Sequence, residues 1–70
     1  MMKKINIEGM SCMHCVMHVK NALNEVKGVS KVDVDLKGKF ATVEGENIIE
    51  DDLRQAIEDA GYEVVSIEEA

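Results

Sequence analysis

Two cysteines separated by two residues are the side chains of this sequence best suited to chemistry. Cys12 and Cys15 stand in the segment GMSCMHC, residues 9–15. A disulfide between them would close a loop too small to stabilise a fold appreciably. Two thiolates at this spacing can instead hold one soft metal ion from two sides, which suits copper(I), because that ion accepts two or three sulfur ligands. The spacing therefore predicts a two-thiolate metal site.

Zinc binding and disulfide chemistry are the main alternatives for this pair. A structural zinc site uses four ligands, and the nearby candidates are only His14, His18 and the acids, without a second cysteine pair. A thioredoxin-like Cys-x-x-Cys also lies at a helix start, but it belongs to a larger fold and carries other residues between its cysteines. We therefore favour copper(I) over zinc and over a dithiol oxidoreductase.

The residues around the pair place it between a strand and a helix. Alternating apolar and polar residues over 3–8 predict a strand that ends at Gly9. Downstream, apolar residues recur with the spacing of an amphipathic helix that Gly28 should terminate, and they are Val16, Val19, Ala22, Leu23 and Val26. We expect Cys12 on the loop and Cys15 in the first helical turn, where unpaired N–H groups and the helix dipole lower thiol pKa values.

The middle of the chain predicts a hairpin followed by a second helix. Apolar residues alternate over 32–36 and again over 40–44, on either side of a short turn at 37–39. Acids at 50–52 suit the positive end of a helix, although no strong N-cap precedes them. This helix should end at Gly61 and bury Leu53, Ala56, Ile57 and Ala60.

A last strand over 62–67 completes the predicted fold, and residues 68–70 should fray. The order is strand, helix, strand, strand, helix, strand. Each helix can pack its apolar stripe on the same face of one antiparallel sheet. We therefore predict an α+β, ferredoxin-like βαββαβ sandwich with a four-stranded antiparallel sheet and two helices on one face.

Length and composition favour a small binding module over an enzyme. The chain has 70 residues, and we expect residues 1–70 to form a single domain with one thin core. Phe40 and Tyr62 are its only aromatic residues, too few to enclose a large substrate pocket. The chain has no apolar run long enough for a signal peptide or a membrane span. We therefore expect a reducing, cytoplasmic location without membrane insertion.

The charge of the chain is negative and unevenly distributed. A net charge of −6 argues against nucleic acid as a partner, because the phosphate backbone would repel the chain. Residues 1–43 carry seven lysines against four acids, whereas residues 44–70 carry ten acids against one arginine. Such polarity can orient a docking partner, or it can simply keep the surface solvated.

The motif and its setting resemble the heavy-metal-associated domain. The resemblance is carried by residues 9–15, by Val29 at the start of the second strand, and by the segment AIEDAGYEV at 56–64, and it spans almost the whole chain. Similar members are bacterial copper chaperones of the CopZ type and amino-terminal domains of copper-transporting P-type ATPases, which have a ferredoxin-like fold. The segment 45–49 departs from the family pattern, because it is shorter than usual and has isoleucine where a serine cap is common.

The resemblance implies particular roles at the metal loop. Cys12 and Cys15 would be the copper(I) ligands, Met10 an apolar anchor beneath the loop, and Tyr62 a neighbour that shields or hydrogen-bonds a cysteine sulfur. Met10 also continues the apolar alternation of the first strand, which favours a core position over metal ligation.

Two histidines lie close to the pair in sequence. His14 could raise the thiolate character of its neighbours or act as a weak ligand, but we expect it to point to solvent. His18 lies one turn beyond Cys15, and we expect it on the polar face of the helix.

These features predict a copper(I)-binding metallochaperone. It would pass the ion by thiolate exchange to a copper-transporting P-type ATPase domain or to a copper-responsive regulator. A free-standing chaperone is favoured over a detached ATPase domain, because the chain begins with Met and ends after the last strand. A mercury, zinc or cadmium carrier is the alternative, although zinc-selective relatives tend to carry an acid where this chain has Ser11. Both a monomer and a metal-bridged dimer are reasonable.

Overall fold

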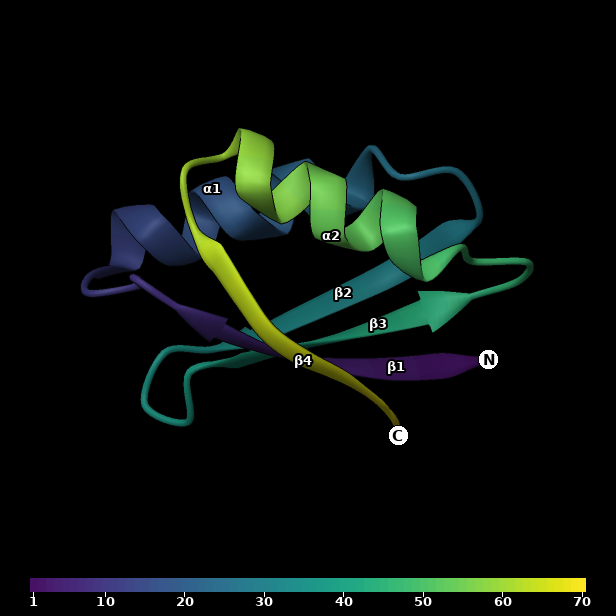
Figure 1. Ribbon diagram of the computed structural model, residues 1–70, viewed down its shortest axis with the longest axis horizontal. Helices are drawn as coiled ribbons and strands as arrows, with labels where there is room; N and C mark the ends of the chain where they lie inside the picture. Colours follow the sequence, from purple (N-terminus) through teal and green to yellow (C-terminus); the bar gives the residue numbers. More distant parts are fainter.

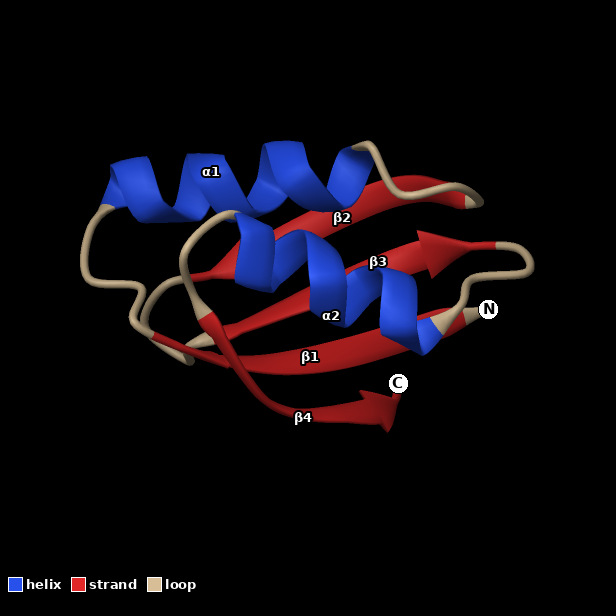
Figure 2. Cartoon of the chain, turned by 45° about the horizontal axis from the view of Figure 1, so that its top comes forward, coloured by secondary structure: helices blue, strands red, loops and turns tan.

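The computed structural model describes residues 1–70 and contains four strands and two helices (Figure 1). In chain order they are β1 (Met2–Glu8), α1 (Met13–Asn24), β2 (Val29–Asp35), β3 (Phe40–Gly45), α2 (Glu50–Asp59) and β4 (Glu63–Glu69). The strands form one antiparallel sheet in the order β2-β3-β1-β4. Figure 2 shows both helices on the same face of this sheet. The predicted ferredoxin-like fold is confirmed.

The core lies between the sheet and the two helices. The central strands contribute the alternate residues that face the helices, and α1 and α2 contribute one apolar stripe each. Burying a side chain of this size contributes roughly 1.5–3 kcal/mol relative to leaving it exposed. The core consists of Ile5, Ile7, Met10, Val16, Val19, Leu23, Val32, Ala41, Val43, Ile48, Leu53 and Ile57.

Helix α1 ends at Asn24, which corrects the prediction that it continues to Gly28. The N–H of Val26 donates to the carbonyl of Leu23 at 3.1 Å, three residues back, so the chain turns more tightly than an α-helix. Val26 therefore lies beyond the helix, although its side chain still packs against the core. Gly28 belongs to the turn that follows, with a φ of +93°.

Strand β4 extends to Glu69, so the prediction that residues 68–70 fray is wrong. Glu69 lies opposite Lys3 of β1, and the N–H of Ala70 donates to the carbonyl of Met2 at 3.2 Å. The ammonium group of Lys3 is buried and forms ion pairs with Glu69 and with Glu50. These contacts hold the last residues of the chain against β1.

Helix α2 begins at Glu50, directly after the segment 45–49 that departs from the family pattern. The residue at its N-cap, Ile49, makes no side-chain capping bond. Three acids occupy the first turn instead, where their charge complements the positive end of the helix dipole. No helix of the structure is long and apolar enough to span a membrane.

Candidate metal centre

The loop that joins β1 to α1 places both cysteines where the helix begins. Cys12 is the N-cap residue, in an extended conformation, and its carbonyl accepts the N–H of Val16 at 3.2 Å. Cys15 lies in the first turn of α1. The loop is at the left end of the molecule in Figure 1. The cysteines thus have the positions that their sequence context predicts, next to the unpaired N–H groups of a helix start.

The two sulfurs are close together and free. The Sγ atoms of Cys12 and Cys15 are 3.4 Å apart, far longer than the roughly 2.05 Å bond of a disulfide. Metal–thiolate bonds are about 2.3 Å long, so a single ion can reach both sulfurs. Cys12 is exposed, whereas Cys15 is half-buried and packs against the core. One thiol is therefore open to solvent while the other is anchored.

The environment of Cys15 favours its thiolate form. A hydrogen bond with the backbone of Ser11 lowers the pKa of Cys15 from 9.0 to about 6, with smaller contributions from the side chains of Tyr62 and Cys12. These groups stabilise the charged sulfur and outweigh the opposing effect of burial. A hydrogen bond to Cys15 also raises the pKa of Tyr62, because the hydroxyl must keep its proton to donate it, and burial adds to this effect. Cys15 is thus prepared to bind a metal ion near neutral pH.

Tyr62 reaches the site because of the way α2 ends. The N–H of Tyr62 donates to the carbonyl of Ile57 at 3.1 Å, and that of Gly61 donates to the carbonyl of Glu58 at 3.0 Å. These bonds form a Schellman motif, which needs the left-handed φ of +96° at Gly61. The motif turns the chain back toward the metal loop, where the Tyr62 ring packs next to Gly9.

The other side chains near the cysteines lie in different environments. Met10 is 6% exposed and belongs to the core, so its side chain supports the loop from below. Met13 is 63% exposed and lies on the outside of α1. His14 and His18 are both exposed on the same helix. Ser11 was not among the predicted site residues, since a backbone contact leaves no mark in the side-chain pattern.

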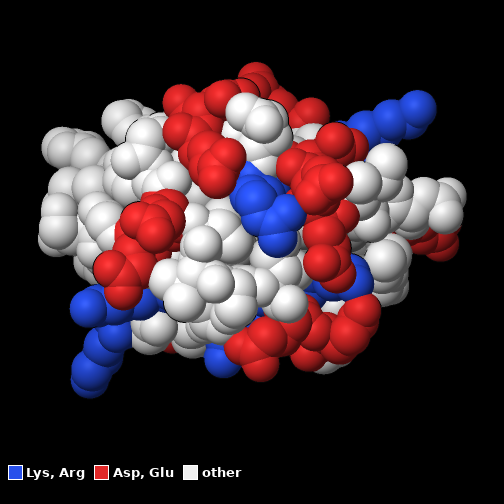
Figure 3. Space-filling model, viewed as in Figure 1, with Lys and Arg blue, Asp and Glu red and all other residues white.

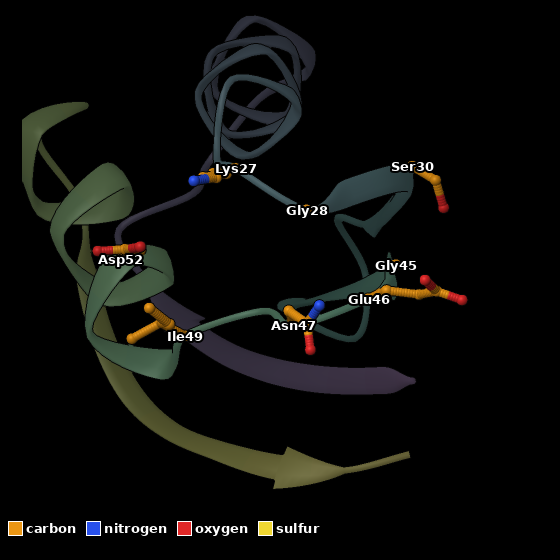
Figure 4. A pocket seen from close by; sticks show the side chains of 8 residues that line it. All are labelled: Lys27, Gly28, Ser30, Gly45, Glu46, Asn47, Ile49 and Asp52. Atoms are coloured by element: carbon orange, nitrogen blue, oxygen red, sulfur yellow. The ribbon is translucent and has the colours of Figure 1, made fainter.

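The two thiols form a small site that no other ligand completes. No cluster of three or more His, Cys, Asp or Glu side chains able to hold a metal ion is present. A cavity of about 820 Å³ lies at the other end of α1, between Lys27 and Asp52 (Figure 4). Its volume would suit a small ligand, but only one hydrophobic residue, Ile49, lines it, unlike a typical ligand pocket. The chemistry of the molecule is therefore concentrated on the exposed loop.

Charge is distributed unevenly around this loop. Figure 3 shows many acidic side chains over the face that carries α2, and uncharged atoms at the upper left, bordered below by acidic and basic side chains. The acids of α2 are Glu50, Asp51, Asp52, Glu58 and Asp59. Acidic charge also reaches the metal loop itself, because the exposed Glu8 directly precedes Gly9 and lies opposite Glu63 of β4.

A ferredoxin-like sandwich with a free thiol pair at the start of its first helix defines a metal-binding domain. The family model of the heavy-metal-associated domain matches residues 4–63, and the chain belongs to this family. The chain is 41% identical to the copper chaperone CopZ of Staphylococcus aureus over 63 aligned residues. This alignment covers 87% of this chain and 93% of that protein. Its relatives are thus metal chaperones and metal-binding domains.

Two solved structures show the same fold with related sequences. A CopZ metallochaperone superimposes with a TM-score of 0.89 and 39% identity over 93% of this chain and 100% of the other. A copper-binding domain from a P-type ATPase superimposes with a TM-score of 0.84 and 36% identity, covering 96% of this chain and 97% of the other. The resemblance stated from the sequence is therefore confirmed.

Proposed function

We propose that this protein carries copper(I) on Cys12 and Cys15 and passes it to a partner protein. The observation that carries the proposal is the pair of free sulfurs, 3.4 Å apart, on an exposed loop that opens a helix. The relatives named as copper chaperones and the copper-binding ATPase domain support this reading. In this proposal the chain performs no catalysis, since its thiols act as ligands.

The number and type of donors support copper(I) over zinc. Two thiolates suit a soft ion of low coordination number, whereas structural zinc sites are closed by four ligands. No further His, Cys, Asp or Glu side chain joins Cys12 and Cys15 in a group that could hold a metal ion. An ion held by only two sulfurs stays open to attack by a third. The same open site would accept mercury(II) or cadmium(II), so the metal must be determined by competition.

Ion transfer follows from the difference between the two thiols. A partner's thiolate attacks the bound ion, forming a three-sulfur intermediate, and one of the original ligands then leaves. We expect Cys12 to leave first, because it is exposed and can move away with the partner, whereas Cys15 is half-buried and packs against the core. Charge is conserved in each exchange, since one thiolate replaces another on the same ion.

The partner should present its own paired cysteines on a surface that fits the exposed metal loop of this protein. A metal-binding domain of a copper-transporting P-type ATPase meets this requirement, and a copper-responsive regulator is the second candidate. A surface lysine of α1, Lys20, could orient the approach of an acidic partner through long-range attraction. The chain could also work as such a domain within a larger transporter, with unchanged metal chemistry.

An anaerobic competition titration tests the metal assignment. The reduced protein is titrated with copper(I) against a chromogenic chelator, and zinc(II) is then added as competitor. We expect one copper per chain, held against zinc. The matched control is Cys12→Ser/Cys15→Ser, in which both thiolates are lost while the loop keeps its size, and we expect it to lose tight copper binding.

Three results would contradict the proposal. Full copper affinity in the double serine variant would show that other residues bind the ion. A preference of the wild-type thiols for zinc, cadmium or mercury would replace the copper assignment with one of those metals. Catalytic turnover of disulfides by the reduced protein would instead indicate an oxidoreductase.

A further inference from the structure

Helix α1 carries a second pair of metal-ligating side chains outside the thiol site. His14 and His18 are four residues apart within the continuous helix Met13–Asn24. Residues at this spacing are neighbours on one face of a helix, with Cβ atoms about 5–6 Å apart. Both side chains are exposed, so each imidazole is free to rotate toward the other. The same spacing places the two zinc-binding histidines of the His-Glu-x-x-His motif on one helix face.

The exposed surface around this pair has no packing role. The buried stripe of α1 consists of Val16, Val19 and Leu23, which face the sheet. Met17, between the two histidines, is 56% exposed, and Asn21 one turn further is exposed as well. Neither histidine takes part in a hydrogen bond or an ion pair with another side chain. The pair is therefore accessible and has no competing partner within the protein.

We propose that His14 and His18 chelate a divalent ion of intermediate softness, with copper(II) bound most tightly and nickel(II) and zinc(II) more weakly. Imidazole nitrogen suits these ions, and the order of affinity follows the general series for first-row metals. Water would occupy the remaining coordination positions, as it does in open metal sites. The two sites thus differ in chemistry, with sulfur for copper(I) at the start of the helix and nitrogen for divalent ions along its exposed side.

This second site changes how zinc binding by the protein must be interpreted. Zinc taken up by the wild type could occupy either the thiols or the histidines. Zinc retained by Cys12→Ser/Cys15→Ser would be bound outside the thiols, at the histidines in this proposal, and would leave the copper(I) assignment untouched. The two proposals therefore fail independently of each other.

The test is a titration of the folded Cys12→Ser/Cys15→Ser protein with copper(II), nickel(II) or zinc(II) alone, above the ordinary pKa of imidazole. This background also prevents copper(II) from oxidising thiols. We expect one ion per chain and shifted or broadened NMR signals of both imidazoles. Adding His18→Gln should weaken binding by roughly tenfold or more, because the second ligand then no longer benefits from proximity to the first.

The matched control keeps two exposed histidines on the helix but separates them. In His18→Gln/Asn21→His, built on the same background, the imidazoles are seven residues apart, about 10.5 Å along the axis, too far to share one ion. We expect it to bind as weakly as His18→Gln alone. Equal affinity in all three proteins would overturn the proposal and assign the ion to another site such as the terminal amine. Signals of only one imidazole responding in the parent variant would overturn it as well.

Discussion

At the scale of single residues, the two cysteines of the site differ in their surroundings. Cys12 is exposed at the N-cap, whereas Cys15 packs against the core and receives contacts from Ser11 and Tyr62. A spacing of three along the sequence predicts that both can bind the same ion, but it does not distinguish them. The difference arises from tertiary structure, because Tyr62 comes from the far end of the chain.

The lowered pKa of Cys15 predicts that this thiol is alkylated well below pH 9. We expect alkylation of Cys15 by iodoacetamide, followed at each cysteine by mass spectrometry, to rise with a midpoint near its pKa of about 6. The Cys15 thiolate is more stable in the folded than in the unfolded state, so it should add to the free energy of unfolding at a pH above its ordinary pKa of 9.0. This contribution should disappear as the pH falls through about 6. A midpoint close to 9 would contradict the described environment.

Tyr62→Phe removes the hydroxyl group and keeps the ring. The pKa of Cys15 should rise part of the way from about 6 toward its ordinary value, because the larger contribution from the Ser11 backbone remains. The alkylation profile of the variant would show this as a shift to higher pH. Ser30→Ala is the control, since it also removes one hydroxyl group, which donates to the carbonyl of Glu44 far from the thiols, and it should leave the profile nearly unchanged. Identical shifts in both variants would show that Tyr62 has no specific role.

The sequence identifies some residues of the site and misses others for physical reasons. The short spacing and the loop context single out Cys12 and Cys15, and the apolar alternation predicts the buried position of Met10. The role of Ser11 comes from its backbone, which every residue shares. Lys3 looks like an ordinary exposed lysine, since only the approach of α2 and β4 reveals that it is buried.

At the scale of elements, hydrophobic periodicity predicts the order and type of every strand and helix. The boundaries are less well predicted, because they depend on contacts between distant segments. Gly28 resembles a helix terminator, but helix α1 ends earlier, at Asn24. Gly28 instead lets the turn after α1 pass close to the carbonyl of Glu46, where a Cβ would clash. Gly61, in contrast, does end its helix as predicted. The two glycines look alike in sequence and differ in what surrounds them.

Alanine substitutions at these two glycines should separate crowding from backbone strain. Gly28→Ala would place a Cβ 2.3 Å from the carbonyl oxygen of Glu46, at a φ of +93°, and should lower the free energy of unfolding by about 1–3 kcal/mol. In Gly61→Ala the added Cβ has no atom within 4 Å, so the left-handed φ is the only source of strain. It should lower the free energy of unfolding by about 1 kcal/mol. Urea denaturation measures both. A smaller loss at Gly28 than at Gly61 would contradict the described contact.

At the scale of the whole molecule, one buried charge connects the first strand to the last two elements. Lys3 is 5% exposed and bridges Glu50 at the start of α2 and Glu69 at the end of β4. Both carboxylates raise its pKa, chiefly through hydrogen bonds. The contribution of this cluster to stability is therefore complete below the ordinary lysine pKa of 10.5 and is lost as the pH rises through the higher folded value.

Reversing the charge of Lys3 should destabilise the fold in a pH-dependent way. Lys3→Glu would gather three carboxylates around one buried position, so we expect a clear drop in the thermal unfolding temperature at neutral pH, with partial recovery in acid as the glutamates become protonated. Circular dichroism at the two pH values measures this. Lys31→Glu is the control, because Lys31 is exposed and only loosely paired with Asp33 at 3.8 Å. Similar losses in both variants would argue against the buried cluster.

The first and last residues of the chain lie side by side, since Ala70 bonds to Met2 and the two ends are close together in Figure 1. Strand β1 then runs for seven residues, roughly 20 Å, before it reaches the metal loop. A tether, tag or surface anchor attached to either end would therefore leave from the edge opposite the thiols. The molecule can be immobilised, or joined in series with copies of itself, with every thiol pair still facing outward.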